Sequence, residues 1–220
     1  MNVAMVFAMA QPGQSMPLAR GTGKFGKRVL DLGLILIALP VLFVCFVALA
    51  LAVRLTSRGP VFFVQTRVGR HGVPFGMVKF RSMVVDAEKL RADVLALDDR
   101  QGLCFKAKAD PRITPVGRLL RRASLDELPQ LINVLRGDMS LVGPRPALPE
   151  EVAAYPAEAL ERLAVLPGIT GAWQVAGRAD LSFEQMVALD VGYVRTATLM
   201  TDLHLLAQTV RAVASGRGAY

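Results

Sequence analysis

Two adjacent carboxylates, Asp126 and Glu127, are the residues of this chain best placed by type and spacing to do chemistry. Arginines flank them on both sides in the sequence: Arg118, Arg121 and Arg122 upstream, Arg136 and Arg145 downstream. A carboxylate can hold a metal ion or act as a nucleophile, and guanidinium groups bind phosphate oxygens in pairs. The stretch 124–146, which ends in a rigid Gly-Pro-Arg-Pro turn, therefore predicts a site that handles phosphate.

A purely structural role for the same acids is the alternative. Ser124 and Glu127 have the spacing of a capping box, in which Ser124 caps a helix and Glu127 reaches back to the Ser124 amide. The two interpretations are compatible, because a helix N-terminus carries partial positive charge. That charge keeps nearby carboxylates ionised and favours anionic ligands.

Other catalytic patterns are missing from the sequence. His71 and His204 have no partner pattern, the two cysteines Cys45 and Cys104 lack metal-ligand spacing, and no glycine-rich phosphate loop or dinucleotide fingerprint occurs. The predicted chemistry therefore depends on carboxylates and arginines. An Asp-Glu pair with a divalent cation suits phosphoryl transfer, because the metal neutralises developing charge while a carboxylate attacks phosphorus.

The composition combines positive charge with apolar character. The chain has 220 residues, enough for one domain with a real core, and 26 basic against 18 acidic residues give a net charge of +8. Hydrophobic residues nevertheless make up 53% of it and the mean hydropathy is positive. This balance argues against a typical soluble nucleic-acid binder and indicates an anionic membrane surface.

The longest apolar run, residues 32–53, is uncharged for 22 residues, or roughly 33 Å as a helix. A single crossing of a bilayer is one interpretation. Pro40, however, divides the run into arms too short to span alone, and basic residues flank both ends. We therefore favour a re-entrant helix hairpin over residues 21–58, broken at Pro40, with both ends on the cytoplasmic side. Residues 1–20 are interpreted as a poorly ordered tail.

The remainder, residues 59–220, is expected to form one catalytic domain. Residues 61–67 and 74–81 are rich in β-branched and aromatic side chains and predict a β-hairpin with a turn near 70–72. Helical patterns cover residues 86–97, 118–122, 128–135, 148–164, 182–195 (capped by Ser182) and 196–215. The predicted fold class is α+β and mainly helical, with a membrane hairpin, a small β-hairpin and amphipathic interfacial helices.

Two C-terminal segments carry open alternatives. The glycine-rich stretch 166–178 predicts a loop that forms a ligand wall, although its single tryptophan, Trp173, is at least as well explained by packing. In the last helix, Leu199, Leu203, Leu206, Val210 and Val213 fall on one stripe. That stripe is expected to dock on the domain, with the lipid interface or a homodimer as alternatives.

Several motifs together resemble the bacterial sugar transferase family, the monotopic polyprenyl-phosphate phosphoglycosyl transferases. They occur in family order from about residue 26 to the C-terminus: Lys27-Arg-x-x-Asp31, Arg58-Gly-Pro-Val-Phe-Phe-x-Gln65, Arg67-Val-Gly-Arg70, Lys79-Phe-Arg-Ser-Met83, Ser124-Leu-Asp-Glu-Leu-Pro-Gln-Leu131, Gly137-Asp-Met-Ser-Leu-Val-Gly-Pro-Arg-Pro146, Pro167-Gly-Ile-Thr-Gly171 and Trp173-Gln-Val-x-Gly-Arg178. In one departure, Leu39 precedes Pro40 where some members have a serine. Large family members carry extra transmembrane helices before this domain, and this chain is expected to be the minimal catalytic form without them.

The resemblance implies an enzyme of the bacterial inner membrane, with its active site on the cytoplasmic face. Such enzymes transfer a phosphosugar from a UDP-sugar to polyprenyl phosphate, releasing UMP, at the first membrane step of glycoconjugate or exopolysaccharide synthesis. By the same resemblance Asp126 is the nucleophile that carries the phosphosugar, and Glu127, with Asp126, holds Mg²⁺. Further family positions fall on Lys79, Arg121, Arg145, Arg178 and Asp190, which are expected to bind phosphate or substrate.

A rival hypothesis is a membrane-anchored basic adaptor that binds anionic lipid or nucleic acid without catalysis. The net charge of +8 motivates it, and it predicts strongly salt-dependent DNA binding. No recognisable DNA-reading motif supports it, so the enzyme is the preferred hypothesis and nucleic acid is not an expected partner.

Overall fold

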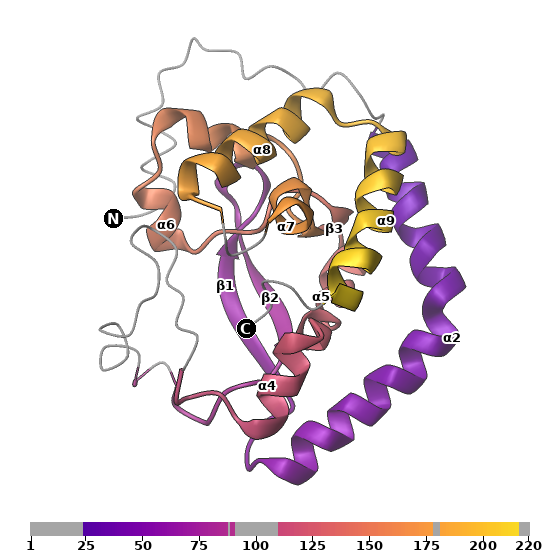
Figure 1. The fold of residues 1–220 in the computed structure, drawn as a ribbon, viewed down its shortest axis with the longest axis vertical. Coiled ribbons are helices and arrows are strands. Elements are labelled where there is room, and N and C mark those ends of the chain that lie inside the picture. Colours follow the sequence, from indigo (N-terminus) through magenta and orange to yellow (C-terminus); the bar gives the residue numbers. More distant parts are fainter. Residues whose placement is uncertain (1–23, 88, 91–109, 178–180, 216–220) are drawn as a thin grey trace.

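In this computed structural model, the structure describes residues 24–87, 89–90, 110–177 and 181–215. The prediction of a mainly helical α+β protein is confirmed: helices surround two small sheets of two strands each. Figure 1 shows the long helix α2 (Lys24–Thr56) along one edge of the molecule, with α9 (Leu199–Ser215) beside one end and α4 (Pro115–Arg122) beside the other. The predicted N-terminal tail and residues 91–109 lie outside the described residues.

Helix α2 continues through Pro40 as one helix, so the complete break predicted there is not observed. Proline removes the hydrogen bond to the carbonyl four residues earlier and crowds the preceding turn, which kinks a helix. The ribbon of α2 accordingly changes direction about midway along its length (Figure 1). It is the one helix among the described residues that is long and apolar enough to cross a membrane, by length and composition only.

The first half of α2 is tied to the globular part by polar contacts. The Lys27 ammonium lies 2.6 Å from the Asp202 carboxylate of α9, and the Arg28 guanidinium donates to the carbonyls of Val134 and Leu135. The Asp31 carboxylate accepts from the Leu141 amide at 3.2 Å. The basic residues that precede the apolar run thus anchor this half of the helix to the domain.

The second half of α2 packs on the same globular part through apolar side chains. Val53 is buried in a cluster with Phe80 and Leu120, joined by Phe46 and Leu49. Outward-facing side chains between the two anchored ends are largely apolar and exposed, among them Leu36, Ile37, Val41, Phe43, Val44 and Leu51. Both ends of the helix therefore rest on one body while its middle presents an apolar face.

The predicted β-hairpin is present. Strands β1 (Phe62–Val68) and β2 (Pro74–Phe80) pair antiparallel across a short turn, η1 (Arg70–Gly72), with Phe63 opposite Lys79 and Gln65 opposite Met77. Met77 and Phe80 are buried in two different clusters on opposite faces of β2, and Lys79 lies on the same face as Met77. Met77 and Lys79 line one hollow together, so this face of β2 is where Lys79 is available to a site.

The glycine-rich segment after residue 166 is more regular than predicted. Strand β4 (Gly168–Thr170) pairs in parallel with β3 (Ser140–Val142), and a short helix, α7 (Ala172–Ala176), follows it. A Cβ atom on Gly168 would lie 2.0 Å from the Gly143 amide nitrogen, so only glycine permits this approach. Trp173 is buried, which favours the packing interpretation.

The helix predicted over 86–97 is a turn at residues 86–87 and 89–90, and the rest of it lies outside the described residues. The other predicted helices are present, with one split. Residues 148–164 form a short helix α6 (Pro149–Ala153) and a 3-10 segment η4 (Ala157–Ala164), because Pro156 lies between them. Helix α8 (Phe183–Thr196) begins at Ser182, whose hydroxyl accepts from the Gln185 amide at 3.3 Å, as predicted. Helix α5 (Gln130–Arg136) corresponds to the helix predicted over 128–135, after the carboxylate pair.

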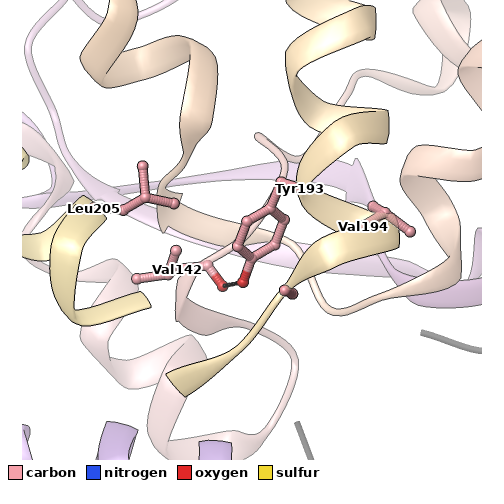
Figure 2. Close-up of a cluster of buried hydrophobic side chains, with 5 residues drawn as sticks. Val142, Tyr193, Val194 and Leu205 are labelled. Atoms are coloured by element: carbon pink, nitrogen blue, oxygen red, sulfur yellow. Dashed lines mark hydrogen bonds between the residues drawn. The ribbon is translucent and has the colours of Figure 1, made fainter. Parts of the chain in front are cut away.

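The docking prediction for the last helix holds for Leu206, which packs against the core, and is wrong for three other residues of the stripe. Leu199, Leu203 and Val210 are exposed, whereas Asp202 and Leu205 are buried and the Thr209 hydroxyl bonds that of Thr170. Figure 2 shows Leu205 in a cluster with Val142, Val194 and Tyr193, whose hydroxyl lies 3.3 Å from the Val142 carbonyl oxygen. Partners for the Asp202 carboxylate, Lys27 and Tyr193, fix this rotation of α9.

Candidate functional site

Asp126 and Glu127 lie on a short 3-10 turn, η3 (Leu125–Glu127), between α4 and α5. The capping-box interpretation is wrong: Ser124 adopts a left-handed conformation with φ of 55°, and its side chain makes no capping bond. Such a conformation is uncommon for a residue with a side chain, and it reverses the chain after α4. The two carboxylates are consequently free of a helix-capping role and face other partners.

The buried side-chain amide of Asn133 holds the turn that carries Asp126 and Glu127, the dyad turn, against the β-hairpin. Asn133 of α5, fully buried, donates to the Gly76 carbonyl at 2.8 Å and accepts from the Val78 amide at 3.0 Å. These bonds satisfy backbone groups of β2 that have no strand partner on that side. They fix α5, and with it Glu127, at a constant distance from Lys79 on the same strand.

Helix α4 is held equally closely on the other side of the turn. The Thr114 hydroxyl caps it by accepting from the Gly117 amide at 2.9 Å. A Cβ on Gly117 would lie 1.9 Å from the Ser82 carbonyl oxygen, so the helix rests directly on the chain that follows β2. In consequence Arg121 Nε reaches the Ser82 hydroxyl at 2.9 Å.

Glu127 is the acid that the cations neutralise. Lys79 Nζ lies 2.7 Å from its Oε1, and Arg145 Nη1 lies 3.9 Å from the same oxygen. Burial alone would raise the pKa of Glu127, but the charges of Lys79 and Arg145 outweigh it and hold that pKa below its ordinary value. Glu127 is therefore ionised at neutral pH.

Asp126 has a different environment although it is the next residue. It is 7% exposed and forms no ion pair with any residue in the described part of the chain. Burial raises its pKa, and the neighbouring Glu127 charge raises it further, while Lys79 and Arg121 oppose both effects. The two adjacent carboxylates are thus unequal: one is paired, and one is buried beside cations without being paired to them.

The arginine of the Gly-Pro-Arg-Pro turn is held in place from the hairpin. Arg67, buried on β1, donates to the Pro146 carbonyl at 3.1 Å and to the Gln65 side chain at 2.7 Å. Burial and the nearby Arg145 charge lower the pKa of Arg67 to about 10, which leaves it protonated. Val68 continues the anchor by donating its amide to the Ala147 carbonyl at 2.9 Å. Arg145 is thereby fixed beside Glu127.

A shallow hollow, open to solvent, lies where these elements meet. Its wall includes the charged residues Lys79, Glu127 and Arg145, and Asp126 is not part of it. The other lining residues come from the hairpin, from α5, from β4 and from α7: Met77, Gln130, Pro146, Gly168, Ile169 and Gln174. Two cations and one carboxylate at the rim of one hollow suit an anionic, phosphate-bearing ligand.

Asp190 and Arg178, which were also predicted as site residues, are not part of this arrangement. Asp190 is fully buried on α8 and its Oδ2 lies 2.7 Å from Arg162 Nη2 of η4. Burial raises the pKa of Asp190 to about 6, against the opposing charge of Arg162. It packs two helices together rather than lining the hollow. Arg178 lies outside the described residues.

The donor set fits a magnesium ion shared with a substrate. The part of the chain that the structure describes contains no group of three or more His, Cys, Asp or Glu side chains able to hold a metal. Magnesium, however, commonly takes one or two carboxylates and completes its shell with water and substrate phosphates. Glu127 at the rim of the hollow and the adjacent Asp126 supply such a pair.

Three supporting residues were not predicted as site residues from the sequence. Asn133 and Arg67 position Glu127 and Arg145, and Gln130 lines the hollow itself. Each is a polar side chain that is almost completely buried. A signal was available for Asn133, because an amide in the apolar helical pattern 128–135 must find a buried partner.

Comparison with known proteins adds independent findings. A family described as bacterial sugar transferase matches residues 22–216. The undecaprenyl-phosphate galactose phosphotransferase of Salmonella typhimurium is 41% identical over 92% of this chain and 43% of its own length. The exopolysaccharide production protein ExoY of Sinorhizobium fredii is 37% identical over 91% of both chains. The UDP-glucose:undecaprenyl-phosphate glucose-1-phosphate transferase of Caulobacter vibrioides is 39% identical over 93% of this chain and 75% of its own.

The lengths of these relatives differ. The chain spans less than half the length of several of the curated relatives it matches, including the Salmonella protein and the galactosyl transferase CpsE of Streptococcus agalactiae. It spans most of ExoY. The aligned region includes the hairpin, the dyad turn and the Gly-Pro-Arg-Pro turn in every case where more than nine-tenths of this chain is covered.

Proposed function

The chain belongs to the bacterial sugar transferase family, and we propose that it transfers a phosphosugar from a UDP-sugar to polyprenyl phosphate, releasing UMP. The observation that carries the proposal is the Lys79–Glu127–Arg145 cluster at the rim of the hollow, next to the unpaired carboxylate of Asp126. Three relatives with undecaprenyl phosphate, a UDP-sugar or exopolysaccharide production in their names support it.

Asp126 is the nucleophile in this proposal. Its carboxylate oxygen attacks the phosphorus that bears the sugar, the bond from that phosphorus to the bridging oxygen breaks, and UMP leaves with the electron pair. A phosphate oxygen of the polyprenyl carrier then attacks the same phosphorus, and the Asp126 carboxylate is released unchanged. The absence of an ion pair at Asp126 supports this assignment, because Glu127 is already neutralised by Lys79.

The cations hold the phosphates during both steps. Lys79 and Arg145 flank the hollow and Arg121 lies on the Asp126 side, where charge accumulates as the phosphorus is attacked. Glu127, with Asp126, would hold Mg²⁺, which when bound supplies charge neutralisation to the diphosphate. The rigid supports of these side chains, Asn133 and Arg67, keep the cluster in place without rearrangement.

The membrane arrangement is part of the proposal. Both ends of α2 contact the same globular part, Lys27 at one end and Val53 at the other. A straight helix of that length would extend about 50 Å and separate its ends across a bilayer. We therefore propose that α2 enters and leaves the cytoplasmic leaflet of the inner membrane on one side, which holds the basic hollow at the level of the lipid phosphate.

The activity is tested by UMP release. Purified protein in detergent is supplied with Mg²⁺, undecaprenyl phosphate and each member of a panel of UDP-sugars, and the expected result is UMP formation with at least one of them. Omitting the lipid acceptor should leave a covalent phosphosugar on the protein, which peptide mass spectrometry locates. Its presence on Glu127 instead of Asp126 would overturn the nucleophile assignment. Salt-dependent DNA binding without any turnover would instead support the adaptor.

The topology is tested by labelling. Single cysteines at Thr22 and Ser57, in a background with Cys45 and Cys104 replaced by serine, are treated with a membrane-impermeant thiol reagent on intact and on opened cells. We expect both positions to react only after opening. Reaction of one position from outside would contradict the re-entrant arrangement.

A further inference from the structure

Gln130 is a buried amide that opens on the hollow. It is the first residue of α5, only 2% of its surface is exposed, and it lines the hollow with Glu127 and Arg145. Among the described residues its side chain bonds no protein group, and its amide is not closed off from solvent, so it faces the open side of the hollow. The other buried amide of this helix, Asn133, contrasts with it by bonding both its donor and its acceptor to β2.

An amide in this situation needs a partner from outside the chain. Burying an amide without a hydrogen bond costs about 1–3 kcal/mol in proteins, and buried polar side chains are in the large majority satisfied. The Gln130 amide reaches no protein partner, so the group that satisfies it must enter the hollow. Water fills this role in the free protein, and a ligand can replace it.

The chemistry of the amide indicates which part of a sugar nucleotide it meets. The phosphate oxygens have Lys79 and Arg145 on the rim, and cations bind them more strongly than a neutral amide does. An amide offers two donors and one acceptor oxygen, which matches a hydroxyl group that both donates and accepts. Met77, Pro146 and Ile169 provide an apolar wall beside it, as the carbon face of a sugar ring requires.

We propose that Gln130 binds a hydroxyl group of the transferred sugar. This inference rests on the proposed function, because it assigns the sugar half of the donor to the hollow that the cationic cluster flanks. Gln130 forms a hydrogen bond in the Michaelis complex and takes no part in bond making at phosphorus. It orients the sugar so that the phosphorus faces the dyad.

The test is a hydroxyl scan. UMP release is measured for the best UDP-sugar and for its 2-, 3-, 4- and 6-deoxy analogues, with the unmodified protein and with Gln130→Met, which keeps the length of the side chain and removes the amide. We expect kcat/KM to fall about tenfold for Gln130→Met with the parent sugar. For the unmodified protein, one deoxy analogue should lower kcat/KM by a similar factor relative to the parent sugar. For Gln130→Met, that same analogue and the parent sugar should have equal kcat/KM values, because the hydrogen bond is already missing.

If the loss in kcat/KM from Gln130→Met and the loss from removing a hydroxyl multiply for every deoxy analogue, the inference is overturned, because the amide then contacts none of these hydroxyl groups. Gln208→Met is the matched control, since Gln208 bonds His204 on α9 and its replacement should leave all five values unchanged. If Gln130→Met does not fold, Gln130→Asn, which withdraws the amide by one methylene, is scanned in its place. No UMP release by the unmodified protein from any UDP-sugar would sink the proposed function, and this inference with it.

Discussion

Two lysine–acid pairs in this protein have nearly the same geometry and different surroundings. Lys79 lies 2.7 Å from Glu127 at the hollow, and Lys27 lies 2.6 Å from Asp202 between α2 and α9, each lysine side chain being 16% exposed. The acids differ: Asp202 is almost completely buried, whereas the Glu127 side chain is 22% exposed. Tyr193 closes the first environment by donating to Asp202 at 2.7 Å.

The difference separates a structural pair from a functional one. At Asp202 one cation and one hydroxyl satisfy the carboxylate, and burial beside Asp202 raises the pKa of Tyr193, so that its hydroxyl keeps the donated proton. Arg145 at the hollow and Arg121 near Asp126 add cationic charge, and Asp126 forms no ion pair with the part of the chain that the structure describes. The buried pair, whose charges are balanced, contributes to stability. The partly exposed cluster has more cationic than anionic groups and can bind a further anion.

The largest effect that would sharpen this contrast is on activity. Asp126→Asn should reduce UMP release by on the order of 10³-fold or more, because the amide cannot attack phosphorus. Its melting temperature should stay close to that of the unmodified protein, since no ion pair is broken. UMP release and thermal unfolding in the same detergent measure both. Retained turnover would contradict the role of Asp126.

The closed pair should show the opposite pattern. Lys27→Met leaves the Asp202 carboxylate buried with only Tyr193, and breaking a buried pair in this way costs about 3 kcal/mol of unfolding free energy. Denaturant unfolding measures it. The double variant Lys27→Met/Asp202→Asn should regain most of that stability, because the uncompensated charge is gone. A lone Lys27→Met variant as stable as the unmodified protein would show that the pair is not structural.

Lys79 should affect the pH dependence of the reaction. Asp126 attacks as a carboxylate, so the rate is lost as the pH falls through its pKa, which burial raises and the charge of Lys79 lowers. Lys79→Met removes the lowering charge, so the acidic limb of the pH–rate profile should move to higher pH. Single-turnover UMP release across pH measures the limb. A limb that stays in place would disconnect Lys79 from Asp126.

The smallest expected effect is that of breaking an ion pair at the surface. Arg195 of α8 binds Glu161 through two hydrogen bonds of 2.9 and 2.6 Å, but both groups lie at the surface. Solvent and salt screen such pairs. Arg195→Gln should therefore change neither the melting temperature nor the pH–rate profile measurably. A clear loss of stability would mean that geometry alone, rather than burial, determines the value of a pair here.

Local patterns in the sequence predicted much of the framework. β-Branched and aromatic residues over 61–67 and 74–81 predicted the β-hairpin, Ser182 marked the start of α8, and Pro156 explains why one predicted helix became two segments. The structure also brings together the residues predicted for the site, Asp126, Glu127, Lys79, Arg121 and Arg145, and their chemical roles stay predictions. Spacing and residue type suffice where the partners are neighbours in the chain.

Other expectations failed because a distant partner outweighed a local preference. Ser124 and Glu127 had capping-box spacing, but Lys79 from a strand binds Glu127 and the chain reverses at Ser124. Asp190 was expected in the site and pairs with Arg162 instead. In α9 the apolar stripe of Leu203 and Val210 faces outward, since Asp202 turns toward Lys27. None of these partners is near in sequence.

By itself, the sequence determined the apolar helix, the hairpin and the family, and it singled out the two acids as candidates, because these depend on residue types and short spacings. Only the tertiary structure decided that the acids are unequal, that Gln130 opens on the hollow, and that both ends of α2 rest on one body. Burial and long-range charge set those properties. They exist only once segments more than a hundred residues apart, such as Lys27 and Asp202, have come into contact.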